Sequence, residues 1–163
     1  MHAALRTLSA VALLAVAACA PHFAHQGPPG PPPIPYGQAT ETQIEHAMDR
    51  YSSLMLAMDA SGLASMYAPD GVMERQSGNA LHGRDEIRTV LASAGNVRVL
   101  SNQMTTISIA YNGPAVVQTG EFHQSARVNG KVVNAAGRFE ATWVRGPHGE
   151  WFIERMVTYP AGN

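Results

Sequence analysis

The sequence contains a single cysteine, Cys19, and only 14% of its 163 residues are charged. A lone cysteine excludes an intrachain disulfide framework. Basic and acidic side chains nearly balance, 11 against 12, so the chain lacks the excess positive charge that DNA or RNA binding requires. It also has no glycine-rich phosphate loop, no nucleophile elbow and no zinc-ligand spacing. We therefore expect no nucleic-acid partner, no metal and no cofactor.

No apolar run near the N-terminus is long enough to span a bilayer, which needs about 20 residues. Residues 8–18 follow Arg6 and suit the apolar core of a signal peptide. The string VAAC, which ends at Cys19, resembles the lipobox of bacterial lipoproteins, whose cysteine is lipid-modified and becomes the first mature residue. The resemblance implies a signal peptide at 1–18 and a membrane anchor at Cys19 on the periplasmic side. Because Ala20 is not aspartate, it favours the outer membrane.

An ordinary secretory signal, with Cys19 incidental and the protein secreted or periplasmic, is the alternative. Residues 19–38 begin with this cysteine and are rich in proline and glycine, so they cannot build a packed core. They are interpreted as an extended tether, with a proline-rich ligand for another domain as the alternative. The folded domain is expected at residues 39–160.

Three helices are expected at the start of this domain. Thr40 and Gln43 form a capping-box pattern, and apolar residues then recur at spacings of three and four to about Met58. A shorter helix is expected to open at residues 61–62 and to stop at Pro69. After a strand at residues 72–76, a third helix is expected to follow Gly83. Its first turn contains Asp85 and Glu86, and its expected buried stripe consists of Ile87, Val90 and Leu91.

The pattern becomes β from Val97 onward. A strand at residues 105–111 precedes a turn at 112–114 and a long strand at 115–128. The dipeptide Asn129-Gly130 predicts a two-residue hairpin turn. It pairs Val128 with Lys131, and this register collects the apolar residues of both strands on one face. The opposite face receives the pairs Glu121/Arg138 and Thr119/Glu140.

A turn at residues 146–149 predicts one further hairpin, ending in a strand at 150–159. Two registers are considered. With Arg145 opposite Glu150, Glu154 lies on the apolar face, where an acid without a partner is costly. A shift of one residue turns Ile153 and Val157 inward and Glu154 to solvent, and this register is favoured because its inner face is more hydrophobic.

The strings MYAPDGVMERQ, LHGRDEIRTVL and GRFEATWVRGPHGEWFIER resemble the nuclear transport factor 2-like superfamily, and its SnoaL-like branch in particular. The resemblance covers roughly residues 39–159. It implies an α+β cone in which three N-terminal helices pack on a curved antiparallel sheet around an apolar pocket. The superfamily includes isomerases, dehydratases, cyclases, epoxide hydrolases and non-catalytic binders, so the resemblance specifies fold better than activity.

The ketosteroid isomerases of this superfamily use a tyrosine and a protonated aspartic acid as an oxyanion hole, and an aspartate as base. Their catalytic tyrosine lies sixteen residues before a second tyrosine, a spacing that Tyr51 and Tyr67 reproduce. The position of the family's base is Arg75 here, and that of its second acid maps to Ala141. One of three catalytic roles is matched, which argues against the isomerase mechanism.

Glu74 and Arg75 occupy successive strand positions, so only one of them can face a pocket. Arg75 there would suit an anionic ligand, whereas Glu74 there would be a candidate base. Both could instead lie on a solvated edge strand. Tyr51 has two interpretations as well: it donates a hydrogen bond to a ligand, or it only contributes to the core.

We expect a lipid-anchored envelope protein whose domain binds a small apolar or amphipathic molecule. Two alternatives remain: an acid–base enzyme of the isomerase, dehydratase or cyclase kind, using Tyr51 and Glu74, and a non-catalytic dimeric interaction module. The family resemblance implies that a homodimer would form through the sheet face that carries Arg138, and a solvated face with weak ion pairs is the alternative. The expected ligand-binding residues are Tyr51, Met55, Tyr67, Arg75, Phe139 and Trp143.

Overall fold

The computed structural model describes residues 37–76 and 78–161, which lie in the second of two units of the chain, Pro35–Asn163. The expected signal peptide (1–18), Cys19 and nearly all of the expected tether (19–38) lie outside the described residues. The elements follow in the order α1 (Gln38–Ala57), α2 (Ala60–Ser65), β1 (Tyr67–Arg75), β2 (Leu81–His82), α3 (Gly83–Ala92), β3 (Val97–Asn112), β4 (Ala115–Val128), β5 (Lys131–Arg145) and β6 (Trp151–Pro160).

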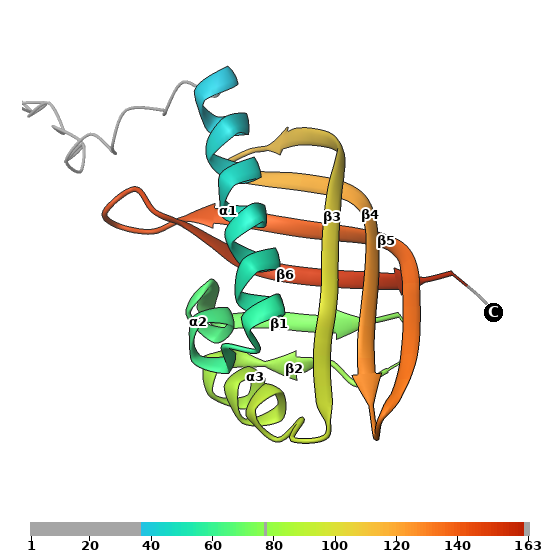
Figure 1. Cartoon of the computed structure of the whole chain (residues 1–163). Helices are drawn as coiled ribbons and strands as arrows, with labels where there is room; N and C mark the ends of the chain where they lie inside the picture. The colour runs from blue at the N-terminus through green and yellow to red at the C-terminus, as the bar shows by residue number, and fades with distance from the viewer. Residues whose placement is uncertain (1–36, 77, 162–163) are drawn as a thin grey trace, which may run out of the picture. The chain divides into compact units, whose positions relative to one another are not determined.

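The strands form one curved sheet in the order β2-β1-β6-β5-β4-β3, and α1 lies across one of its faces (Figure 1). All neighbouring strands are antiparallel except β1 and β6, which run parallel. This pairing joins the segment that follows the first two helices to the last strand of the chain. The expected α+β arrangement of helices on a curved sheet is therefore present, with one parallel pairing in it.

The hairpin between β4 and β5 has the predicted register throughout. Val128 pairs with Lys131, Gly120 with Phe139 and Val116 with Trp143. Asn129 and Gly130 both have positive φ, 49° and 82°, as the two central positions of the predicted turn require. Because side chains alternate across a strand, this register decides which residues of β4 and β5 face α1.

The last hairpin begins in the favoured of the two registers. The expectation that Val157 points inward is wrong, because a later shift in register pairs Val157 with Glu140 on the outer face. Ile153 pairs with Trp143 and is fully buried, whereas Glu154 is exposed. The register shifts by one residue between Thr142 and Trp143, and a β-bulge of this kind lets both Ile153 and Met156 point inward. The expectation that Glu154 faces solvent is confirmed.

The predicted capping box is wrong. The helix α1 begins two residues before Thr40, with Gly37 at the N-cap and no side-chain cap. Thr40 is 3% exposed inside the first turn. The Gln43 side chain instead accepts hydrogen bonds from Trp151 Nε1 and Arg145 Nη2, both at 3.0 Å. A tertiary contact to β5 and β6 has replaced the local cap.

The predicted end of the second helix is also wrong. The helix α2 stops at Ser65, and Pro69 lies within β1, which begins at Tyr67. The register between β1 and β6 shifts between Tyr67 and Val72, so Pro69 occupies an irregular stretch. Proline is tolerated there because no ladder hydrogen bond needs its missing N–H.

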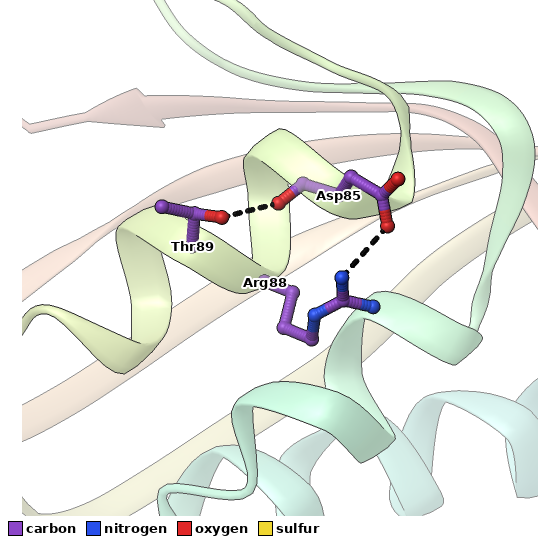
Figure 2. A network of polar contacts seen from close by, with 3 residues as sticks. All are labelled: Asp85, Arg88 and Thr89. Atoms are coloured by element: carbon purple, nitrogen blue, oxygen red, sulfur yellow. Dashed lines mark hydrogen bonds and ion pairs between the residues drawn. The ribbon is translucent and has the colours of Figure 1, made fainter.

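The third helix, α3, begins at Gly83 itself, whereas the prediction placed its start after this glycine. Asp85 and Glu86 lie in its first turn as predicted. Figure 2 shows Asp85 binding Arg88 Nη2 at 2.8 Å through its carboxylate, while its carbonyl accepts a hydrogen bond from Thr89 Oγ1. This ion pair is solvent-exposed and contributes little to stability. The expected buried stripe is only partly correct: Ile87 is buried, but Val90 is 43% exposed.

The core lies between the inner face of the sheet and α1. Here "inner" means the face that α1 covers. Large side chains from both layers are fully buried in it: Ile44 and Met48 from α1, and Phe139, Trp143, Ile153 and Met156 from the sheet. Among the described residues, no helix has the length and hydropathy needed to cross a bilayer.

Candidate functional site

The inner face of the sheet is not filled along its whole length. Under the C-terminal half of α1 it borders a cavity of about 300 Å³, called the main cavity below. Exposed residues at its rim, Arg75, Asn79 and Ala135, mark where it opens. A volume of this size is at the small end of ligand-binding pockets. Its wall is mostly apolar and includes Met55, Met73, Met104, Phe122 and Met156.

Tyr51 projects from α1 into this wall and is 6% exposed. Burial raises the pKa of Tyr51 above its usual value of 10.0, and the neighbouring hydroxyl of Tyr67 partly offsets the rise. The phenol therefore stays neutral at physiological pH and keeps a proton to donate. A donor in a water-poor apolar cavity forms stronger hydrogen bonds than one in water.

Tyr67 is fully buried behind Tyr51 and does not belong to the cavity wall. Burial raises the pKa of Tyr67 well above its usual range, and the interaction with Tyr51 adds to the rise. Its Oη nevertheless has no partner with full hydrogen-bonding geometry among the described residues. The two hydroxyls are thus in loose contact, close enough to influence each other's pKa without a well-formed hydrogen bond.

Glu74 and Arg75 separate onto the two faces of β1. Arg75 pairs with Thr158 and alternates with Met73, and all three border the main cavity. The arginine is therefore the residue on the cavity face, at the rim. The Glu74 carboxylate is bound by Arg155 Nη2 at 2.6 Å. Its main-chain carbonyl accepts a hydrogen bond from Thr158 Oγ1 at 3.4 Å.

The ion pair leaves Glu74 poorly suited to act as a base. It is the one acid among the described residues that border the cavity. The Arg155 guanidinium donates a hydrogen bond to one of its carboxylate oxygens and so occupies it. The other candidate acid, Glu154, is exposed elsewhere on β6. The cavity thus has donors in its wall and no free carboxylate.

Two amides in the wall were missed by the sequence analysis. Asn102 on β3 and Gln124 on β4 pair across the strands, and Gln124 Nε2 donates to Asn102 Oδ1 at 3.1 Å. Asn102 Nδ2 is buried, and none of the described residues accepts a hydrogen bond from it. In this orientation the unpaired atom is a donor, and with both amides turned over it would be the Asn102 oxygen, an acceptor.

Phe139 and Trp143, expected at the ligand, lie in the closed core and not in the cavity wall. Trp143 is fully buried, and its Nε1 donates to Gln118 Oε1 at 3.0 Å. Gln118 Nε2 in turn donates to Thr106 Oγ1 at 2.8 Å. These side chains satisfy one another and leave no polar group for a ligand. Of the expected ligand-binding residues, Tyr51, Met55 and Arg75 border the cavity.

The other polar features of the domain do not gather into a site. Within the described ranges, no three histidine, cysteine, aspartate or glutamate side chains are placed to hold a metal ion. Glu121 and Arg138 pair on the outer face of the sheet, as predicted. A hollow of about 370 Å³ in that face is bordered by Ile107, Arg138 and Phe139. The main cavity is the better candidate for a small-molecule site because its wall is mostly apolar and includes the Tyr51 hydroxyl as a donor.

Comparison with known proteins identifies the fold. The chain resembles a ketosteroid isomerase-like protein from Erwinia carotovora atroseptica (18% identity, TM-score 0.69), covering 78% of this chain and all of the other. A conserved protein from Planctomyces limnophilus is similar, with 20% identity and a TM-score of 0.69 over 77% of this chain and 98% of the other. ActVI-ORFA from Streptomyces coelicolor is similar as well, with 15% identity and a TM-score of 0.64 over 75% of this chain and 97% of the other. At these identities the likeness establishes the nuclear transport factor 2-like fold alone.

No match was found among curated proteins. A family model described as the SnoaL-like domain matches residues 39–157, nearly the whole of the described region. The chain belongs to the SnoaL-like domain family.

Proposed function

We propose that this chain is an exported, lipid-anchored envelope protein whose SnoaL-like domain binds a small amphipathic molecule without converting it. The observation that carries the binding proposal is the main cavity, about 300 Å³ of mostly apolar wall with two hydrogen-bond donors in it. These donors are the Tyr51 hydroxyl and an amide N–H of the Asn102–Gln124 pair. The ligand that suits such a wall is an apolar body with an acceptor such as a carbonyl oxygen.

We propose that the domain does not convert its ligand, because within the part of the chain that the structure describes no acidic side chain at the main cavity is free to act as a base. A proton-abstracting mechanism needs a base within hydrogen-bonding reach of the substrate. Among the described residues, the one acid at the cavity is held by Arg155, and Arg75 occupies the cavity face beside it. An arginine does not act as a base at physiological pH.

An enzyme remains the second candidate because of one observation. Two donors in the wall of the main cavity, one a neutral tyrosine, would polarise a carbonyl group in the way that an oxyanion hole does. This activity would need Glu74 to leave Arg155 and to turn from the opposite face of β1 toward the cavity. Incubation of the full chain with 2-acetylnaphthalene in D₂O distinguishes the candidates. We expect its methyl protons to exchange at the buffer rate, whereas exchange that depends on the protein and is lost in Glu74→Gln would favour the enzyme.

The binding site itself is tested by filling it. Met104 lies in the cavity wall, so Met104→Trp should occupy the space that a ligand needs. Isothermal titration with 2-acetylnaphthalene should show binding to the wild type and at least tenfold weaker binding to this variant. Ile107→Trp is the matched control, because Ile107 is 64% exposed on the same strand. Equal affinity of all three proteins would contradict the proposal.

The membrane anchor is proposed from the string VAAC and the apolar run before it. Lipidation at Cys19 would place the domain at the end of the proline-rich segment that follows. The mass of the mature protein tests this directly. A chain that begins at Cys19 and carries a diacylglycerol is expected, and an unmodified cysteine in the membrane-free fraction would contradict the anchor.

A homodimer through the outer face of the sheet is a separate proposal. It is supported by the exposed Ile107 beside Arg138 and Glu140, whose opposite charges would complement each other across a two-fold axis. Light scattering on the full chain, with Ile107→Lys as the disrupting variant, tests it. Equal masses close to that of a monomer for both proteins would contradict it.

A further inference from the structure

A second cavity lies beside the main one and is called the rear cavity. Its volume is about 130 Å³, and it lies where the end of α1 meets α2, the end of α3 and the beginning of β3. All but one of its lining side chains are apolar, and none of its described lining residues is exposed. The rear cavity therefore differs from the main cavity, whose rim includes exposed residues.

Two side chains, Met55 and Gln124, border both cavities. A single layer of side chains thus separates the two spaces. Gln124 is held in place by its hydrogen bond to Asn102. Met55 is unbranched, and rotation about its side-chain bonds breaks no polar contact. Met55 is consequently the part of the partition that can move at low cost.

The rear cavity also has a composition that suits one kind of ligand group. Its wall is built from aliphatic and thioether side chains, among them Met58, Leu63, Leu91 and Val99. Protein interiors contain few voids larger than a water molecule, because atoms that line an empty space lose their packing contacts. An apolar void with one polar neighbour attracts a hydrocarbon chain far better than it attracts water.

We infer that the rear cavity is a second subsite, which receives the apolar chain of an elongated ligand once Met55 turns aside. The polar group of the same ligand remains in the main cavity, beside Tyr51 and the Asn102–Gln124 pair. The ligand class is therefore a linear amphipathic molecule with an acceptor near one end, in preference to a compact ring system. This inference rests on the proposed binding function and adds the shape of the ligand to it.

The experiment uses the full chain and straight-chain 2-alkanones, from 2-hexanone to 2-tridecanone, which displace bound 2-acetylnaphthalene. In the wild type, affinity should rise about fourfold for each methylene that is buried. Ala60→Leu places two added branches in the rear cavity, since Ala60 lines it. In this variant the affinity should stop rising at a shorter chain length. The longest ketones should bind it at least tenfold more weakly than they bind the wild type.

Three further variants sharpen the result. Met55→Ala removes the partition and should bind the longest ketones at least as tightly as the wild type does. Leu56→Ala is the matched control on the same helix, because Leu56 is 49% exposed, and it should change nothing. If circular dichroism shows that Ala60→Leu is unfolded, Ala94→Leu fills the same cavity from α3's end and is judged by the same criterion.

Two failures are distinguishable. If 2-acetylnaphthalene does not bind the wild type, the proposed function itself fails and the rear subsite falls with it. If it binds, but the longest ketones bind the filled variant as tightly as the wild type, the main cavity holds the whole ligand. That second result overturns only the inference about the rear cavity.

Discussion

The two halves of the sheet's inner face differ although one helix covers both. Under the N-terminal half of α1 the space is closed by Trp143, Phe139 and Ile153, which are fully buried. Under its C-terminal half the same strands border the main cavity. We call these the closed half and the open half. The comparison indicates that the fold needs one half for its stability and leaves the other available for a ligand.

The two halves also differ in how the side-chain amide that each contains is hydrogen-bonded. Gln118 in the closed half is fully buried, and both ends of its side chain are bonded, to Thr106 and to Trp143. Asn102 in the open half has a bonded oxygen and an unpaired, buried nitrogen. Buried polar groups are nearly always paired in folded proteins, so an unpaired one at a cavity suggests that its partner is a ligand or water.

The largest expected effect is on the stability of the closed half. Trp143→Ala should lower the free energy of unfolding by about 3–5 kcal/mol, because it removes a large buried side chain and leaves a void. Phe122→Ala in the open half should cost about 1–2 kcal/mol, since the adjoining cavity already limits its contacts. Urea denaturation of both variants checks the difference, and equal losses would show that the two halves do not differ.

The amides provide the next largest effect. Gln118→Leu leaves Trp143 Nε1 buried without an acceptor and should cost about 1–3 kcal/mol of unfolding free energy. Asn102→Leu removes an unpaired donor and also the acceptor of the Gln124 N–H. Because Gln124 borders the cavity, water can replace that acceptor, so we expect a smaller loss, within about 1 kcal/mol. Urea midpoints decide between these outcomes. A loss for Asn102→Leu as large as that for Gln118→Leu would mean that Asn102 has a structural role.

Tyr51 and Tyr67 lie between the two halves, and their raised pKa values predict that the free energy of unfolding depends on pH. Above pH 10 the tyrosines of the unfolded chain lose their protons, while burial raises the pKa of both Tyr51 and Tyr67 in the folded chain. The unfolded state then binds fewer protons, so stability falls as the pH rises, by up to about 1.4 kcal/mol per pH unit for each tyrosine. Tyr67→Phe should reduce this slope between pH 10 and 11, measured by urea denaturation, and an unchanged slope would contradict it.

The smallest effect is expected at the rim. Arg75→Gln should weaken binding of naphthalene-2-carboxylate about threefold to fivefold at low salt, because a solvated charge pair contributes little and is screened. Binding of the neutral 2-acetylnaphthalene should not change. Arg138→Gln on the outer face is the matched control. An equal loss for both ligands would indicate that Arg75 shapes the cavity rather than attracting an anion.

The closed half could be predicted from sequence more fully than the open half. The turn at Asn129-Gly130 and the apolar alternation of β4 and β5 are local signals, and together they gave the register of that hairpin throughout. The same register places Gln124 on the inner face, two residues from Phe122, so that part of the site could have been found. Asn102 could not, because β3 reaches it after a register shift between Val99 and Ser101.

The faces of Glu74 and Arg75 also required the structure. They depend on the parallel pairing of β1 with β6, which joins residues about 80 positions apart, as the Arg155–Glu74 contact does. Local periodicity carries no signal for such a pairing. The cavity itself arises where side chains of β1, β3, β4 and β6 do not meet, and no single segment encodes that space.

The measurement that tests the central claim most directly is a matched pair of titrations. 2-Acetylnaphthalene carries a carbonyl acceptor, and 2-ethylnaphthalene has nearly the same shape without one. The wild type should prefer the ketone by about tenfold, the effect of one hydrogen bond to a donor with no other partner. In a variant that combines Tyr51→Phe, Asn102→Leu and Gln124→Leu, and so lacks every neutral donor named at the cavity, that preference should disappear while 2-ethylnaphthalene still binds. A wild type without the preference, or a variant that retains it, would contradict a ligand site built on these donors.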